Sequence, residues 1–209
     1  GRFELKAEFE KLPSLLKKDV PNGLEEKYTE QSLIKPNDPV LVLRNEGRTS
    51  TSIMLWGFIS EWSKNPFNSS IPRPFNARAE SVGEKRLFRG SWRHKRCLLP
   101  ASGFLEKGHR ITRNDYQVFW LAGIWNRWMS PDGGELESCC VLTTEPNDLV
   151  RSFNKRMPVI IPEGFEEDWI MSVKDGPQLK ELESMLSGWE PDEWLVEPMN
   201  STTLQMSLL

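Results

Sequence analysis

The sequence predicts an α+β fold: a single domain with a curved, mostly antiparallel β-sheet as a barrel-like core, flanked by helices. Short apolar, β-branched and aromatic runs occupy the middle of the chain, whereas helical patterns gather toward its two ends. Strands and helices rarely alternate as they would in a parallel βαβ sheet. Because 209 residues bury one core and require no second one, we expect residues 1–209 to form one domain.

The predicted elements follow in order along the chain. The first is an amphipathic helix that Pro13 kinks or ends, because apolar residues recur at helical spacing at Leu5, Phe9, Leu12 and Leu16. Apolar and β-branched content predicts strands at residues 40–43, 53–59, 97–105, 116–125 and 139–143. A polar loop separates Ile59 from Asn76, and turns at 107–108 and 132–134 connect hairpins. Helices are predicted at 147–153, 163–171 and 178–186.

The composition is 38% hydrophobic and 27% charged, with no apolar run long enough to span a bilayer and no amino-terminal signal pattern. These features predict a cytoplasmic protein without a membrane partner. Cys97, Cys139 and Cys140 lie in predicted strands, and their odd number favours buried thiols over disulfides or metal ligands. Because His94 and His109 are the only histidines and no Cys/His spacing suits zinc, we expect no metal and no cofactor.

Charge is distributed unevenly along the chain. The net charge is -3, yet the segment from Arg73 to Arg113 holds eleven Lys or Arg against three Asp or Glu. Such asymmetry is typical of one basic, phosphate-binding face on an otherwise acidic protein. A solvated surface hairpin is the alternative, but the aromatic residues Phe88 and Trp92 within the segment favour a nucleic-acid groove.

Two side chains in this segment suit chemistry. Glu106 ends the uncharged run 100–105 of a predicted strand, and a carboxylate desolvated in this way has a raised pKa and passes protons near neutrality. The alternative is a solvated strand-end Glu paired with Lys107 or Arg110. Asn76 offers one acceptor and two donors without a charge, which suits holding an amine or a hydroxyl in place, although Asn is also common in turns and caps.

Several motifs together resemble the SRAP family, the SOS-response-associated peptidases, over nearly the whole chain and in the right order. They are Gly1-Arg2-Phe3, Asn76-Ala77-Arg78-Ala79-Glu80, Arg86-Leu87-Phe88, residues 96–106, Thr143-Thr144 and Arg156-Met157-Pro158. Family members carry a cysteine directly before this Gly-Arg-Phe, exposed by removal of the initiator Met. The resemblance therefore implies a cysteine directly before Gly1, at a position that precedes residues 1–209.

The resemblance also implies a role for each matching residue. Glu106 handles protons around the cysteine and Asn76 orients the amine or the sugar. Asn154 stands where the family has a histidine, and it cannot titrate. A segment ending in Trp62 resembles one that stacks on or wedges between bases. The residues implied to hold DNA phosphates are Arg2, Arg78, Arg86, Thr143 and Arg156.

These roles imply a thiol autopeptidase that senses abasic sites in single-stranded DNA. An amino-terminal cysteine presents an amine and a thiol on adjacent carbons, which suits attack on the aldehyde of a ring-opened abasic sugar and closure to a thiazolidine crosslink. The alternative is a noncovalent, single-stranded-DNA-binding relative that has lost this chemistry, as Asn154 suggests. The expected partner is single-stranded DNA containing abasic sites, bound by a monomer.

Overall fold

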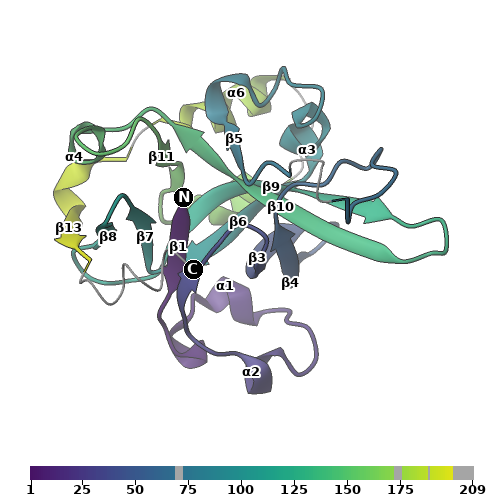
Figure 1. Ribbon diagram of the computed structural model, residues 1–209, viewed down its shortest axis with the longest axis horizontal. Helices are drawn as coiled ribbons and strands as arrows, with labels where there is room; N and C mark the ends of the chain where they lie inside the picture. The colour runs from purple at the N-terminus through teal and green to yellow at the C-terminus, as the bar shows by residue number, and fades with distance from the viewer. Residues whose placement is uncertain (69–72, 172–175, 188, 200–209) are drawn as a thin grey trace.

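A closed five-stranded barrel forms the centre of the computed structural model, which describes residues 1–68, 73–171, 176–187 and 189–199 (Figure 1). Its strands, in order around the barrel, are β10 (Glu135–Thr144), β4 (Thr49–Trp56), β3 (Pro39–Asn45), β6 (Arg96–Ala101) and β9 (Phe119–Met129), which pairs back with β10. All these pairings are antiparallel except that of β4 with β10. This arrangement confirms the predicted α+β class with a barrel-like, mostly antiparallel core.

Three short strands extend the barrel at one end. β5 (Asn76–Arg78) adds to β10 in parallel, β11 (Met157–Pro158) pairs with the last residues of β10, and β12 (Ile160–Ile161) pairs with β9. These strands carry Asn76 and the start of the Arg-Met-Pro motif to the same barrel end.

A second, antiparallel sheet packs beside the barrel. Its order is β13 (Trp194–Pro198), β8 (His109–Arg113), β7 (Gly103–Glu106), β1 (Arg2–Leu5) and β2 (Gln31–Ile34). Only Ser102 separates β6 from β7, so the chain passes from the barrel into this sheet within one residue. The rings of Phe3 and Trp56 meet edge to face at 4.9 Å between centroids, which joins β1 to β4 of the barrel.

Short helices surround the two sheets. The α-helices are α1 (Ser14–Lys17), α2 (Leu24–Lys27), α3 (Arg89–His94), α4 (Asp148–Arg151), α5 (Glu166–Ile170) and α6 (Gly176–Ser184). The 3-10 helices are η1 (Phe9–Lys11), η2 (Ala79–Ser81) and η3 (Pro191–Glu193). In Figure 1, α1 and α2 lie below the barrel, and α3 and α6 lie above it. Within the described part of the chain, no helix combines the length and the apolar character needed to cross a membrane.

The predicted first helix is wrong. Leu5 ends strand β1, Phe9 begins a 3-10 turn, and only Leu16 lies in an α-helix, α1. β1 forms because it lies between β2 and β7, with Phe3 opposite both Ile34 and Phe104. Pairing with distant strands overrides the local helical period. The predicted strand 97–105 divides into β6 and β7, which belong to different sheets, and β1, β2, β13 and α3 have no counterpart among the predicted elements.

Other predicted features are confirmed. The three cysteines are buried free thiols. Lys107 and Gly108 both adopt positive φ in the β7–β8 hairpin, at 44° and 82°.

The inner face of the barrel can be followed along β9. Gly123 faces inward, because a Cβ at this position would lie 2.7 Å from the Leu99 Cδ1 atom and 3.0 Å from the Cys97 Sγ atom. Alternate residues of a barrel strand face the same way, so Leu121 and Arg127 also face the interior. They are six positions apart, which corresponds to about 20 Å along the strand. They therefore mark opposite ends of the barrel, here called the cavity end and the network end.

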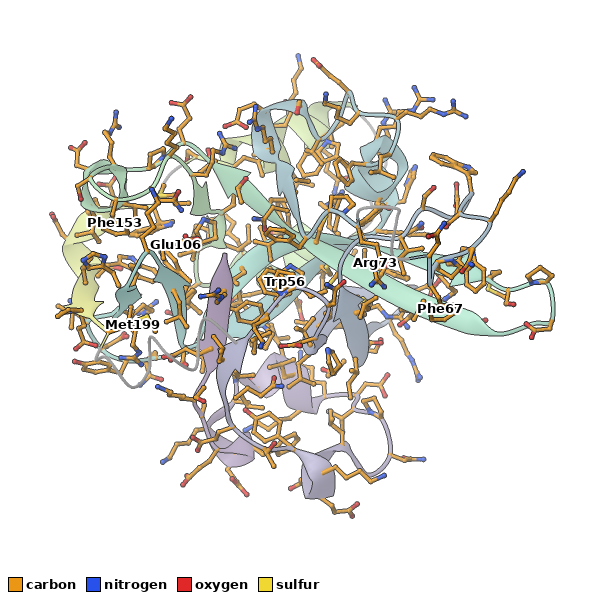
Figure 2. All side chains as sticks on the ribbon, in the orientation of Figure 1. Trp56, Phe67, Arg73, Glu106, Phe153 and Met199 are labelled. Atoms are coloured by element: carbon orange, nitrogen blue, oxygen red, sulfur yellow. The ribbon has the colours of Figure 1, made fainter. Side chains whose placement is uncertain are left out.

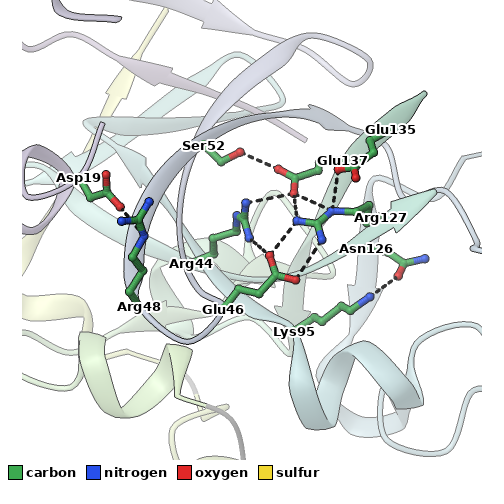
Figure 3. Close-up of polar contacts among 10 residues, drawn as sticks. All are labelled: Asp19, Arg44, Glu46, Arg48, Ser52, Lys95, Asn126, Arg127, Glu135 and Glu137. Carbon is green, nitrogen blue, oxygen red and sulfur yellow. Dashed lines mark hydrogen bonds and ion pairs between the residues drawn. The ribbon is translucent and has the colours of Figure 1, made fainter. Parts of the chain in front are cut away.

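The network end is closed by ion pairs (Figure 3). Glu137 Oε1 lies 2.7 Å from Arg127 Nη2 and 3.1 Å from Arg44 Nη2, and Glu137 Oε2 accepts a 2.7 Å hydrogen bond from the Ser52 hydroxyl. Glu46 accepts further hydrogen bonds from Arg44, at 2.6 Å, and from Arg127, at 2.7 and 3.0 Å. These five residues, called the ionic network, bring together side chains from β3, β4, β9, β10 and the β3–β4 turn.

The ionic network rests on the buried ring of Trp125. The guanidinium carbons of Arg44 and Arg127 lie 4.6 and 5.5 Å from the ring centroid, and Lys95 Nζ lies 5.4 Å from it. Each contact is a cation–π interaction of about 0.5–2 kcal/mol, depending on how far the cation is desolvated. The ring therefore helps to hold three cations together at this end of the barrel.

Candidate functional site

A cavity of about 250 Å³ opens at the cavity end, where the barrel meets the second sheet. The inward-facing residues Trp56, Leu121 and Val141 of the barrel form part of its wall, and Phe3 and Phe104 of the second sheet form another part. The cavity is therefore built mainly from apolar walls, into which a few polar groups project.

Gly1, the first residue of the sequence, lines this cavity beside Glu106. The pairing of Arg2 with Leu105 places Gly1 level with Glu106 on the neighbouring strand. The Gly1 amine nitrogen lies 3.9 Å from Glu106 Oε1. A Cβ built on Gly1 would lie 3.4 Å from Glu106 Oε1 and 3.8 Å from Asn76 Nδ2. An amine, a carboxyl and a carboxamide thus meet around one point.

Glu106 is a carboxyl in an apolar setting. Its side chain is 18% exposed. Burial raises the pKa of the Glu106 carboxyl, and the amino terminus, Lys107 and Arg2 act in the opposite direction. Because desolvation is the largest of these influences, the carboxyl keeps its proton to a higher pH than a solvated Glu. A group of this kind can both donate and accept a proton during a reaction.

Asn76 reaches the cavity from β5. It lies opposite Val141 of β10, and Arg78 lies opposite Thr143 two residues further along. Asn154 lines the cavity from the loop after α4, where its side-chain oxygen accepts a 2.8 Å hydrogen bond from the Lys155 backbone N–H. The asparagine side chains thus reach the cavity from two separate parts of the chain.

Arg156 is already engaged. Its Nη1 and Nη2 atoms donate to the two carboxylate oxygens of Glu80, both at 2.8 Å. Nη2 also donates to the Thr143 backbone oxygen at 2.5 Å and approaches the Thr143 hydroxyl at 3.4 Å. Arg156 and Thr143 both line the cavity. The hydrogen bond from Arg156 is the largest cause of the lowered pKa of Glu80.

The cavity brings together six of the nine predicted site residues, which are Arg2, Asn76, Glu106, Thr143, Asn154 and Arg156. The other three lie outside it. Arg78 is exposed at the end of β5. Trp62 and Arg86 line a second cavity, of about 280 Å³, where the Arg86 guanidinium carbon lies 5.3 Å from the centroid of the Trp62 ring. The Trp62 side chain is 55% exposed.

The loop that carries Trp62 packs on the outside of the barrel. The Trp128 indole N–H donates to the Ser63 backbone oxygen at 2.6 Å, and the Phe67 ring approaches the Trp128 ring at 6.5 Å. In Figure 2, Phe67 and Arg73 lie on one side of Trp56, and Glu106 and Phe153 lie on the other.

The basic segment forms a narrower surface than its sequence predicts. Arg96 is buried and donates to the backbone oxygens of Trp92, Arg93, Trp169 and Met171, and burial lowers its pKa to about 10. Arg110 pairs with Glu4 and Glu197, and Arg113 pairs with Asp115. The exposed cations that remain between Asn76 and Lys95 are Arg78, Lys85, Arg86, Arg89 and Arg93.

Two contacts at the site have no counterpart in the sequence predictions. One is the Glu80–Arg156 ion pair, which joins the last residue of the Asn-Ala-Arg-Ala-Glu motif to the first of the Arg-Met-Pro motif. The other is the stacking of His109 on Phe153, with 4.8 Å between ring centroids and 24° between planes. His109 lies opposite Glu106 in the β7–β8 pair, so the stack supports the hairpin that carries Glu106.

Comparison with known proteins identifies relatives of this chain. The profile of the family described as "SOS response associated peptidase (SRAP)" matches residues 1–203. The abasic site processing protein YoqW of Bacillus subtilis (strain 168) is 31% identical over 205 residues, which cover 92% of this chain and 88% of that protein. The abasic site processing protein HMCES of Xenopus tropicalis is 26% identical over 136 residues, covering 52% of this chain and 41% of its own length.

A solved structure shares the fold. A crystal structure of a protein from Bacteroides thetaiotaomicron superimposes with a TM-score of 0.82, at 22% identity, over 97% of this chain and 94% of that one. The barrel and its accompanying sheet are therefore an architecture that both proteins have.

Proposed function

The chain belongs to the SRAP family, the SOS response associated peptidases, and from this membership we propose that it processes abasic sites by bonding covalently to single-stranded DNA. The abasic site processing relatives support the substrate. The single observation that carries the proposal is the meeting of the amino end of the chain with Glu106 and Asn76 in one cavity. The proposed acting form is a monomer.

The proposed nucleophile is a cysteine bonded to the Gly1 nitrogen. Its amine, with a reference pKa of about 7.7–8.0, is partly neutral at pH 7 and adds to the aldehyde carbon of a ring-opened abasic sugar. Loss of water gives an imine. The thiol then adds to the same carbon, its proton passes to the nitrogen, and a thiazolidine ring closes.

Glu106 is the proposed proton carrier for these steps. In its protonated form it delivers a proton to the hydroxyl that leaves as water, and as a carboxylate it accepts the proton of the thiol. The raised pKa suits this double role, because both forms are then accessible closer to neutral pH. Asn76 is proposed to orient the amine or the sugar, and the same groups would assist removal of an initiator Met from the cysteine.

Flanking DNA phosphates are proposed to lie along the exposed cations that lead away from the cavity. Arg2, Arg156 and Thr143 lie at the cavity itself, and Arg78 lies on the adjoining strand. Further along, Arg86 and Trp62 offer a guanidinium beside an exposed indole, which suits a phosphate next to a stacked base. Each stacked base is worth about 1–3 kcal/mol.

The direct test is adduct formation. Protein with a cysteine before Gly1 should form a denaturation-resistant adduct with an oligonucleotide that contains one abasic site, and with no intact oligonucleotide of the same sequence. The matched control carries serine in place of that cysteine and should form no thiazolidine. Glu106→Gln should slow adduct formation by about 10²-fold or more, because general acid–base catalysis contributes factors of this size.

Noncovalent binding is the alternative outcome, and Asn154 is the observation that favours it, because an amide in the cavity cannot titrate. If the cysteine protein binds the abasic oligonucleotide but yields no adduct at neutral pH, the covalent proposal fails and the binding role remains.

A further inference from the structure

The side chain of Arg156 presents its two-pronged face to Glu80. Both outer nitrogens of the guanidinium donate to the two carboxylate oxygens at 2.8 Å. This is the bidentate geometry in which arginine binds a phosphate. The two guanidinium nitrogens that are proposed to bind a DNA phosphate are therefore occupied by the Glu80 carboxylate. The ion pair carries no net charge.

The Glu80–Arg156 pair lies where it can open. The Glu80 side chain is 48% exposed and the Arg156 side chain 27% exposed. Ion pairs at such positions contribute little, so a competing anion can replace the carboxylate. Arg156 keeps its place when the pair opens, because Nη2 also donates to the Thr143 backbone oxygen.

A neighbouring cavity can receive the released carboxylate. Glu80 lines a cavity of about 700 Å³ between η2, α3 and α6, and the exposed cation Arg93 lines the same cavity. Arg78 also lies close enough to contribute to the lowered pKa of Glu80. Arg78 and Arg93 therefore remain near Glu80 when Arg156 binds another anion.

We propose that Glu80 is an internal substitute for a DNA phosphate, which holds Arg156 in its binding position and is displaced when single-stranded DNA enters. The inference rests on the proposed function, since it needs a phosphate to reach Arg156. Any other anion must therefore compete with the Glu80 carboxylate for Arg156. This competition lowers the affinity for DNA, but the ion pair keeps the Arg156 guanidinium in its binding position.

The test compares the parent, Glu80→Gln, Arg156→Gln and the double variant in binding a fluorescent single-stranded oligonucleotide without an abasic site, over a range of salt concentrations. Glutamine keeps the size of Glu80 and an acceptor for Arg156 but removes the charge. Glu80→Gln should bind about two- to fivefold tighter at low salt, the range of an exposed ion pair. The slope of log affinity against log salt concentration should steepen by up to about 0.7, because the charge of Arg156 is no longer neutralised when it meets a phosphate. In the Arg156→Gln background the substitution should change neither quantity.

Glu84→Gln is the matched control. Glu84 lines the same cavity, changes the net charge equally on substitution, and takes part in no ion pair recorded for the described residues. Equal or weaker binding by Glu80→Gln would overturn the proposal, as would an equal gain from Glu84→Gln or an equal gain in the Arg156→Gln background. The proposed phosphate contact is tested separately, by whether Arg156→Gln alone binds more weakly than the parent, and the proposed function is tested by adduct formation.

Discussion

At the cavity end of the barrel, the partly buried Glu106 carboxyl lies 3.9 Å from the Gly1 amine nitrogen, whereas at the network end Glu137 contacts two guanidinium groups and a hydroxyl at 2.7–3.1 Å. The side chains are almost equally exposed, at 18% and 15%. The two side chains are therefore buried to a similar extent, but their partners differ. Burial destabilises the charged form of Glu106, whereas Glu137 has two guanidinium groups beside its charge.

This difference separates a carboxyl that stabilises the fold, Glu137, from one that is suited to chemistry, Glu106. Removing one member of a buried group of ion pairs is costly, because the remaining charges lose a partner while they stay shielded from water. A buried carboxyl without such partners raises the free energy of the folded protein at neutral pH, and proteins keep such groups at functional sites. The two carboxyls lie near opposite ends of the barrel, Glu106 on β7 of the second sheet and Glu137 on β10.

The largest expected effect comes from opening the network end. Glu137→Ala removes the shared partner of Arg44 and Arg127 and should lower the free energy of unfolding by about 3 kcal/mol, since two partly buried guanidinium groups lose an anion. Glu135→Ala is the control, because Glu135 is 54% exposed and pairs with Arg127 at 3.3 Å, and it should cost less than about 1 kcal/mol. Urea unfolding measures both. Equal costs would show that the ionic network does not stabilise the barrel.

The cavity end should respond in the opposite direction. The folded pKa of Glu106 lies above its unfolded value, so the folded protein binds this proton more tightly, and the associated stability is present at low pH and lost as pH rises through the folded pKa. Glu106→Gln removes this loss. The variant should match the parent near pH 4 and be more stable than the parent at pH 7–8, although it slows the chemistry. Thermal unfolding at several pH values tests this, and a variant less stable than the parent at pH 8 would contradict it.

The smallest expected effect is at Glu46, at the network end, where the free energy of unfolding should depend on pH in the opposite direction. Hydrogen bonds from Arg127 are the largest cause of the lowered pKa of Glu46, so its stabilising contribution is present at neutral pH and lost as pH falls through the folded pKa. Glu46→Gln should cost less than about 1 kcal/mol at pH 7, because the side chain is 47% exposed. The difference from the parent should vanish in acid. A constant difference across the pH range would mean that packing, not charge, explains it.

Much of the barrel is predictable from local patterns. The runs at 40–43 and 139–143 lie within β3 and β10, and every residue of both runs is buried, so neither run needs to alternate with polar residues. β1 is not predictable in this way. Its residues pair with β2 and β7, and the spacing of Leu5 with Phe9 is helical by coincidence.

The site is predictable as a set of residues but not as a set of contacts. Asn76 and Glu106 stand out by residue type and setting, and the fold brings them together beside Gly1. The pairing of Arg156 with Glu80, 76 residues away, depends on tertiary structure that no local pattern encodes. The same limit explains Arg96, whose burial against backbone oxygens removes it from the basic surface.

The central claim, that a cysteine bonded to the Gly1 nitrogen is the reacting group, is tested most directly by locating the bond to DNA. The adduct between the cysteine-containing protein and an abasic oligonucleotide would be digested, alkylated and sequenced by mass spectrometry. The account predicts that the amino-terminal peptide carries the sugar, that the adduct weighs one water less than its two parts, and that the cysteine thiol resists alkylation. Attachment at Lys107, the exposed amine next to Glu106, or at any other internal lysine would contradict the account.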